Sequence, residues 1–232
     1  GWMSEITAES AGDLQTYGAF LANRYTQGNV MWSMGGDYVG DATERAKQWN
    51  IVTGIRSVRA TDIITGHGAR TQSAYEYWSS FEGFNLNNIY TDGTEYTYAS
   101  GEYARSGPIP FILIEGRYDG EGTATEVRRQ PYASILSGAC GHFFGNAPVW
   151  DFGSAPGTGG GVSNALASLT TTATTQMTYV KALFSAYAWH KLAPSSTLVT
   201  TSLGTGTSRI IPALASDGSL AMVWTPSANF TV

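Results

Sequence analysis

The stretch PIPFILIEGRYDGEGTATEVRRQPYASILSGACGHFFGNAPVWDFG, residues 108–153, decides which fold class the chain belongs to. Its residues 109–114 are apolar on consecutive positions rather than on alternate ones. That pattern is typical of a strand buried on both faces, as in a parallel sheet covered by helices. The apolar run stops at Glu115, which places a carboxylate where the strand should reach its C-terminal end.

A helix and a second strand are expected to follow Glu115. Thr123 with Glu126 three residues later has the pattern of a helix capping box, which predicts a helix over about 126–136. The strand-like segment Gly141–Gly145 then opens into the polar and aromatic loop 146–151. This β-α-β unit is typical of barrels whose active sites lie at the C-terminal ends of the strands.

The rest of the chain repeats the alternation of strands and helices. Strands are expected at 29–34, 63–65 and 84–90, and helices at 11–26, 41–59, 96–105 and 165–190, with a glycine-rich loop at Ser154–Gly161. Asp41 and Glu44 are expected to cap the helix at 41–59. Such alternation predicts a parallel sheet with right-handed crossovers. A closed (β/α)₈ barrel needs eight units and about 250 residues. The sequence therefore predicts an α/β fold of the (β/α)₈ TIM-barrel type, with only the C-terminal five βα units present.

The sequence pattern changes from helical to β-like near residue 193. Short β-like segments separated by turn signals follow, which are TLVTTSLG, SRIIPALASDG and SLAMVWTP. We expect residues 1–192 to be a partial barrel and 193–232 to be the short all-β start of a β-sandwich. We also expect a chain truncated at both ends, whose missing strands come from an N-terminal barrel segment or from another chain, because an isolated five-unit sheet exposes apolar edges.

Composition excludes several classes of function. The net charge of −5, with no Lys/Arg cluster, argues against binding of nucleic acid. No apolar run reaches the roughly 18–20 residues of a membrane span. The only cysteine, Cys140, cannot form an intrachain disulfide, and the sequence has no phosphate-binding loop, no nucleophile elbow and no zinc pattern. We expect no metal and no cofactor, and an extracellular or virion-associated location, since few residues are charged.

Two acidic residues have the positions that glycoside cleavage requires. Asp37 and Glu115 each follow a predicted strand, and each lies next to a glycine that leaves room for a substrate. One acid must protonate the leaving oxygen, while the other attacks the sugar or activates water. With retention of configuration the two carboxyl groups should lie about 5–5.5 Å apart. The alternative is that either acid is a helix cap or an ion-pair partner in a loop.

Several ordered motifs resemble one known family. They are NVMWSMGGD, IITGHG, FILIEGRYDGEG, EVRRQPYASILSGACGHFFGNAPVW and WHKLAP, and the likeness covers Tyr17–Pro194. The chain resembles the apiosidase-like glycoside hydrolases, the domain of unknown function 4038 associated with glycoside hydrolase family 140. The resemblance implies a (β/α)₈ barrel that acts on plant-type polysaccharides, including apiose-containing side chains, with Asp37 as general acid/base and Glu115 as nucleophile. The segments after Ser196 are similar to the collagen-binding-like sandwich that often follows this catalytic domain.

Five further residues are expected to bind the substrate, because they lie near the same strand ends or in the family's motifs: His67, Tyr118, His142, Asn146 and Trp150. His67 ends a strand, and the alternative is a histidine that bonds loop carbonyls. Trp150 is expected to stack on a sugar ring or, alternatively, to seal the top of the barrel. His142 and Asn146 belong to the segment GHFFGN, which resembles a motif of the family.

Two functions remain open from the sequence. The first is a glycoside hydrolase that uses two carboxylates, with retention of configuration, on a carbohydrate substrate. The second is a non-catalytic carbohydrate-binding or structural protein of a virion or cell-surface assembly that reuses the barrel. The two differ in whether replacing Asp37 or Glu115 abolishes turnover.

Overall fold

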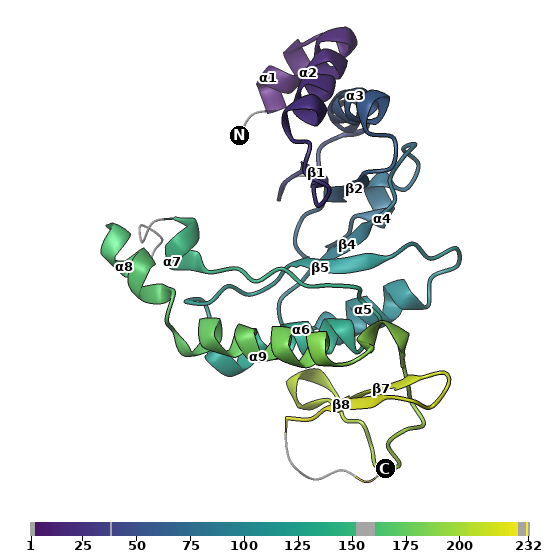
Figure 1. The fold of residues 1–232 in the computed structure, drawn as a ribbon, viewed down its shortest axis with the longest axis vertical. Coiled ribbons are helices and arrows are strands. Elements are labelled where there is room, and N and C mark those ends of the chain that lie inside the picture. The colour runs from purple at the N-terminus through teal and green to yellow at the C-terminus, as the bar shows by residue number, and fades with distance from the viewer. Residues whose placement is uncertain (1–2, 38, 152–160, 227–230, 232) are drawn as a thin grey trace. The chain divides into compact units, whose positions relative to one another are not determined.

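The computed structural model describes residues 3–37, 39–151, 161–226 and 231 of the 232-residue chain. The chain divides into two compact units, Gly1–Tyr90 and Thr91–Val232. Both units combine helices with strands, as Figure 1 shows, so the predicted α/β class is confirmed. The number of βα units in a complete barrel stays a prediction. No helix in the described ranges combines the length and the apolar character that crossing a membrane requires.

The first unit begins with the helices α1 (Met3–Ala8) and α2 (Ala11–Arg24), and a third helix, α3 (Ala42–Val58), follows the first strand. The side chain of Ser10 caps α2 by accepting a hydrogen bond from the amide of Asp13. Asp41 and Glu44 form a full capping box at the start of α3, as the sequence predicted. Both predicted helices are therefore confirmed, although α2 ends two residues early.

Helices α2 and α3 touch backbone to backbone through two glycines. A Cβ atom added to Gly18 would lie 2.0 Å from the carbonyl oxygen of Ile51, and one added to Gly54 would lie 1.9 Å from that of Gln15. Only glycine allows so close an approach of two main chains. At these two positions the main chains of the helices are in direct contact.

The strands of the first unit form two small sheets. Strands β1 (Met31–Gly35) and β2 (Ile63–His67) pair in parallel, whereas β3 (Gln72–Ser73) pairs antiparallel with β4 (Asn87–Tyr90). The parallel pair places Gly35 opposite His67. The carboxyl ends of β1 and β2 consequently lie at one edge of the unit.

Aromatic side chains fill the core between α3 and these strands. The rings of Trp49 and Trp78 stack with 5.5 Å between their centroids, and Phe81 lies 5.0 Å from Trp49. Trp78 belongs to the short helix α4 (Tyr75–Trp78) and is fully buried. Gly66 makes room for it, because a Cβ there would lie 2.5 Å from the indole ring.

The strand predicted at 84–90 is shorter in the structure, where β4 covers Asn87–Tyr90, and it contains two buried asparagines. The side-chain amide of Asn88 donates to Thr65 Oγ1 at 2.7 Å and to the carbonyl oxygen of Gly66 at 2.6 Å. Asn87 Oδ1 accepts from the amide of Tyr75 at 2.8 Å. These bonds satisfy polar groups that would otherwise be costly to bury, so β4 tolerates a sequence poor in apolar residues.

The second unit contains the stretch from which the fold was predicted. Helix α5 (Glu95–Tyr103) precedes strand β5 (Phe111–Glu115), and β5 is buried except at Glu115. The predicted capping box is present at the start of α6 (Ala124–Ile135), where Thr123 and Glu126 bond each other's backbone amides. Gly138 then has a φ of +107°, a conformation that favours glycine at the end of a helix.

The prediction of a regular strand at Gly141–Gly145 is wrong. The segment pairs in parallel with β5 only at a bridge between His142 and Leu113, where the Leu113 amide donates to Gly141 O at 3.1 Å and the Phe143 amide donates to Leu113 O at 3.0 Å. Glycine at both ends of the segment weakens a strand, because it adds backbone entropy and has no side chain to pack. The segment Gly141–Gly145 therefore lies parallel to β5, but the two do not form a continuous ladder of backbone hydrogen bonds.

Two further predictions in this region are wrong. The loop expected at 146–151 contains a short helix, α7 (Ala147–Trp150), which begins at the N-cap Asn146. The helix expected at 165–190 is two helices, α8 (Gly161–Ser168) and α9 (Thr172–Ala186). The break lies at Thr171, whose hydroxyl accepts from the amide of Thr174 and so caps α9. The loop expected at Ser154–Gly161 lies, up to Gly160, outside the described residues.

A three-stranded antiparallel sheet ends the second unit. It follows a 3₁₀ turn (Trp189–Lys191) and consists of β6 (Leu192–Pro194), β7 (Ile211–Ala215) and β8 (Ala221–Trp224), with a second 3₁₀ turn (Gly206–Ser208) before β7. The last two predicted β segments are thus confirmed, whereas the first, TLVTTSLG, forms no strand. Ile211 and Ala213 pack against α6 and α9, where Phe184 belongs to the same core. The boundary at 192/193 and the β-sandwich stay predictions.

Candidate active site

Asp37 lies just beyond the carboxyl end of β1, two residues after Gly35. Its carboxylate is exposed. Gly35 has a φ of +83°, and a Cβ there would lie 2.9 Å from the carbonyl oxygen of His67. A glycine is therefore required at the point where the chain leaves the strand and turns toward Asp37.

His67 ends β2 at the same edge of the first unit. Its Nδ1 atom lies 2.8 Å from the carbonyl oxygen of Gly68, and because a carbonyl can only accept, Nδ1 carries the proton of the neutral ring. The ring also packs edge-on against Tyr90, with 5.6 Å between the centroids. The contacts with Gly68 and Tyr90 thus set the orientation of the His67 ring.

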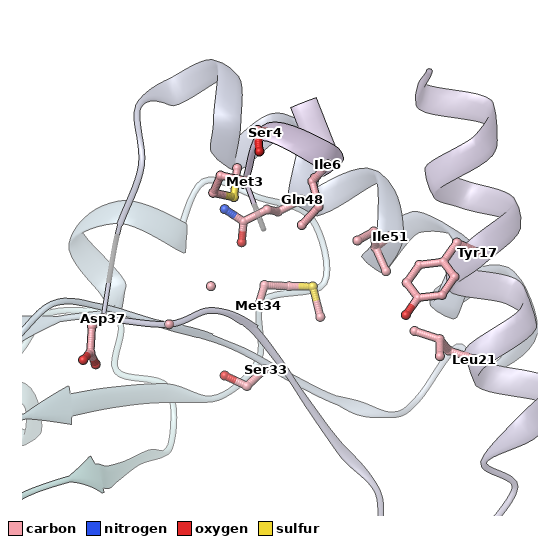
Figure 2. A pocket seen from close by; sticks show the side chains of 12 residues that line it. Met3, Ser4, Ile6, Tyr17, Leu21, Ser33, Met34, Asp37, Gln48 and Ile51 are labelled. Carbon is pink, nitrogen blue, oxygen red and sulfur yellow. The ribbon is translucent and has the colours of Figure 1, made fainter. Parts of the chain in front are cut away.

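A hollow of about 680 Å³ adjoins Asp37 within the first unit. Figure 2 shows Asp37 on one side of it, with Met34 and Gln48 pointing into the space. Its walls are mainly apolar and come from α1, α2, α3 and β1; they include Ile6, Tyr17, Leu21, Met34 and Ile51. The volume is within the range of small-molecule sites, which are mostly apolar with few polar groups.

Gln48 contributes an unusual polar group to this hollow. The residue is 3% exposed, and its Nε2 atom is buried without a hydrogen-bond partner among the described residues. A buried amide without a hydrogen-bond partner costs free energy, so such groups are rare in folded proteins. No sequence pattern predicts this group, because Gln48 lies within the helical pattern of α3.

Glu115 is the last residue of β5 in the second unit. Its side chain is half-buried, and its carbonyl oxygen accepts a hydrogen bond of 3.1 Å from the amide of Thr91. The four residues before it in the strand are buried. Glu115 therefore takes the position that the sequence predicted, at the end of an apolar strand aligned in parallel with the segment that follows α6.

Tyr118 packs against the end of the segment Gly141–Gly145. A Cβ added to Gly145 would lie 2.4 Å from the ring of Tyr118, so the ring occupies the space above that glycine. The amide of Tyr118 also donates to Glu121 Oε2 at 3.0 Å. Tyr118 is half-buried and its orientation is set by this packing.

Asn146 is part of a polar cluster that links three segments of the second unit. Its Oδ1 accepts from the amide of Val149 and from the hydroxyl of Ser168, and its Nδ2 donates to the carbonyl oxygen of Ser168. Buried Asp119 accepts from the hydroxyl of Thr171 in the same cluster. Both atoms of the Asn146 amide are therefore engaged inside the protein, and its role in sugar binding stays a prediction.

Trp150, at the end of α7, is 71% exposed. The neighbouring Val149 is also exposed, as is Phe143. A large exposed indole is uncommon on a soluble surface and offers a flat apolar face to a ring-shaped ligand. Both interpretations of Trp150, stacking on a sugar ring and sealing the barrel, stay predictions.

His142 lies in apolar surroundings. It lines a hollow of about 400 Å³ together with side chains of α6 and α9, among them Pro131, Met177 and Phe184. Burial lowers the pKa of His142 from 6.5 to about 4, so the imidazole is neutral at pH 7. His142 therefore does not act as a cation there. Its contact with the substrate stays a prediction.

The comparisons with known proteins agree with one another on the fold. The family described as "Apiosidase-like, catalytic domain" matches residues 1–191, as the motifs predicted. The chain is similar to the crystal structure of a glycoside hydrolase family 5 protein from Bacteroides vulgatus ATCC 8482, with a TM-score of 0.78 and 20% identity over 89% of this chain and 52% of that one. A structure named a glycoside hydrolase gives a TM-score of 0.75 and 21% identity over 92% of this chain and 56% of that one.

The chain thus spans about half the length of these two solved structures. At such identities the likeness concerns the fold. A search of curated proteins gave no match. The family match covers most of the described helices and strands, from α1 through α9. The chain belongs to the apiosidase-like family and carries residues of its catalytic domain.

Proposed function

We propose that the chain is the C-terminal part of a glycoside hydrolase barrel that cleaves glycosidic bonds in a polysaccharide with retention of configuration. The observation that carries the proposal is the position of the two acids. Asp37 follows a strand that is paired in parallel, and Glu115 ends a buried strand bridged in parallel to the next segment. In (β/α)₈ enzymes, catalytic residues come from the carboxyl ends of strands.

The proposed mechanism has two steps. In the first, a carboxylate oxygen of Glu115 attacks the anomeric carbon while Asp37 donates its proton to the leaving oxygen, so the glycosidic bond breaks and a glycosyl ester forms. In the second, ionised Asp37 takes a proton from water, whose oxygen attacks the anomeric carbon and releases Glu115. The pairing of these two residues rests on the family and on their strand positions.

The substrate class follows from the family and from the exposed aromatic surface. We assign apiose-containing plant-type polysaccharides as the substrate, with Trp150 stacking on a sugar ring and His67 forming a hydrogen bond with a sugar hydroxyl. Tyr118, His142 and Asn146 complete the proposed substrate-binding set. Such polymers are outside cells, so the proposed location is extracellular, with a virion-associated location as the alternative. The mechanism requires neither metal nor cofactor.

Replacement of each acid tests the proposal. The variants are made in the barrel-containing protein, by which we mean this chain together with the strands that complete its barrel. Glu115→Gln should reduce kcat on a 4-nitrophenyl apioside below detection. Asp37→Asn should reduce turnover of an apiose-containing pectin by about 10²–10⁴-fold. Glu76→Gln, an exposed carboxylate on α4, is the matched control and should leave both rates unchanged. Near-normal activity of either variant rejects the role of that residue. Proton NMR of the first-formed anomer distinguishes retention from inversion.

One observation favours the second function, a carbohydrate-binding protein without turnover. The exposed indole of Trp150 offers a binding surface that needs no carboxylate. In that case isothermal titration with the same pectin should give binding that neither Asp37→Asn nor Glu115→Gln alters. Loss of hydrolysis in these variants would exclude it.

We also propose that a β-strand from outside this sequence pairs with β1. Among the described residues β1 pairs only with β2, and the unpaired Gln48 amide faces the hollow beside β1. The chain covers only 52% and 56% of the two similar structures. The strand would belong to an N-terminal barrel segment or to another chain. The native mass tests this: a stable monomer of 24.8 kDa would contradict it.

A further inference from the structure

The peptide that follows Glu115 is held by one side chain of α6. Gln130 Nε2 donates to the carbonyl oxygen of Arg117 at 2.8 Å, and Gln130 Oε1 accepts from the amide of the same residue at 2.6 Å. The side chain thus bonds Arg117 in both directions, much as a neighbouring strand would. Gln130 is 2% exposed, so water does not compete for these bonds.

We call the two hydrogen bonds between the Gln130 side chain and Arg117 the Gln130 clamp. Gly116 leaves the space that this clamp occupies. A Cβ added to Gly116 would lie 1.9 Å from Gln130 Oε1, and the backbone there is buried. A Cβ at this position would push Gln130 Oε1 from its place and so disturb its bond to the Arg117 amide. The glycine after Glu115 therefore serves the clamp, in addition to any room that it leaves for a substrate.

Helix α6, which carries Gln130, is itself held in place. Helix α6 is fixed by its capping box, and Arg129, the neighbour of Gln130, forms a buried ion pair with Glu95 at 3.2 Å. On the other side of the strand end, the amide of Thr91 donates to the carbonyl oxygen of Glu115. The main chain is consequently bonded at Glu115 and again at Arg117, on either side of Gly116.

We propose that Gln130 is a positioning residue for Glu115. By fixing the Arg117 peptide it sets the direction in which the strand ends and so the direction of the Glu115 carboxylate. This inference rests on the proposed nucleophilic role of Glu115. A nucleophile misplaced by about 1 Å can lose a factor of about 10² in rate, which gives the expected size of the effect.

Three variants test the proposal. Gln130→Met keeps the length of the side chain and removes both bonds, and Gln130→Glu keeps an acceptor but loses the donor while it is ionised. The control is Ser134→Ala, one turn further along α6, because this buried hydroxyl donates to the backbone carbonyl oxygens of Gln130 and Pro131 and, among the described residues, bonds neither the Gln130 side chain nor Arg117. Each variant is made in the barrel-containing protein. The readouts are kcat and KM on the 4-nitrophenyl apioside, and hydrogen exchange at the Arg117 amide.

The expected results separate positioning from stability. Gln130→Met should lower kcat by roughly 10²-fold with KM changed less than about twofold, and should speed exchange at Arg117. The kcat of Gln130→Glu relative to wild type should rise as the pH falls, because the protonated acid again donates and accepts. Ser134→Ala should change neither kcat nor exchange at Arg117.

Other outcomes overturn the inference in distinguishable ways. Unchanged kcat in Gln130→Met, together with an inactive Glu115→Gln, would reject the role of Gln130 and leave the proposed function standing. An equal loss of kcat in Ser134→Ala would show that the loss in Gln130→Met comes from general destabilisation and not from positioning. An active Glu115→Gln would reject the proposed function itself, and the catalytic role of the clamp with it, whatever the exchange data show.

Discussion

Asn146 and Ser168 exchange two hydrogen bonds. The amide of Asn146 donates to the carbonyl oxygen of Ser168 at 3.2 Å, and the Ser168 hydroxyl donates back to Asn146 Oδ1 at 2.9 Å. The same Oδ1 caps α7 through the amide of Val149. One side chain therefore joins the start of α7 to the end of α8, and this makes a structural role for Asn146 testable.

Asn146→Ala should destabilise the protein by about 2 kcal/mol, because it removes a helix cap and leaves Ser168 with fewer partners. Urea unfolding followed by circular dichroism measures this loss. A variant that unfolds like wild type but has a raised KM would instead support the predicted contact of Asn146 with sugar.

His142 should make stability depend on pH. Its folded pKa, about 4, lies below the 6.5 of the unfolded chain, so the unfolded state binds more protons between these values. The stability is fully present above about pH 6.5 and is lost as the pH falls toward 4. The difference corresponds to at most about 3 kcal/mol. Unfolding measured from pH 4 to 7 should show this slope in wild type.

His142→Phe provides the comparison, since an aromatic ring suits the apolar hollow and cannot bind a proton. The slope between pH 4 and 6.5 should become smaller in this variant, whereas His190→Asn, at an exposed position, should retain it. A slope that persists in His142→Phe would assign the effect to another group.

Trp150→Ala should weaken substrate binding without weakening the fold. The indole is 71% exposed, so little packing is lost, whereas stacking on a sugar ring would be removed altogether. We expect KM for an apiose-containing pectin to rise by about 10-fold, which corresponds to about 1.4 kcal/mol. Val149→Ala is the neighbouring control. Equal KM values for wild type and Trp150→Ala would contradict the stacking role.

Breaking the ion pair between Glu95 and Arg129 should be costly. Both side chains are buried, at 1% and 8% exposure, and lie 3.2 Å apart. Arg129→Met leaves the Glu95 carboxylate buried without its partner, which should destabilise the protein by about 3–5 kcal/mol. Adding Glu95→Gln should recover part of that loss in thermal unfolding. A double variant no more stable than the single one would show that the pair does not act as a unit.

The sequence predicted the elements whose signals are local. The capping boxes at Asp41 and Thr123 marked the starts of α3 and α6, and the apolar run before Glu115 marked β5. Each of these patterns is complete within a few residues and involves one kind of physical interaction. The strand ends at Asp37 and Glu115 could be found for the same reason.

The errors have a common cause in contacts between distant residues. The helix expected at 165–190 breaks because Thr171 caps α9 and bonds Asp119, which is 52 residues away. The Gln130 clamp involves a residue that looks, in sequence, like an ordinary helical glutamine. The hollow beside Gln48 depends on how three helices meet a strand. None of these contacts leaves a periodic pattern in the sequence.

The glycine contact between α2 and α3 bears on how this protein can be engineered. Exchanging helical glycines for alanine is a common way to raise thermal tolerance, since each exchange can contribute about 1 kcal/mol. At Gly18 or Gly54 a methyl group would force the two main chains apart, and the exchange would do harm. Gly101 in α5 has nothing within 4 Å of an added Cβ and is exposed, so it is the helical glycine at which a stabilisation programme should begin.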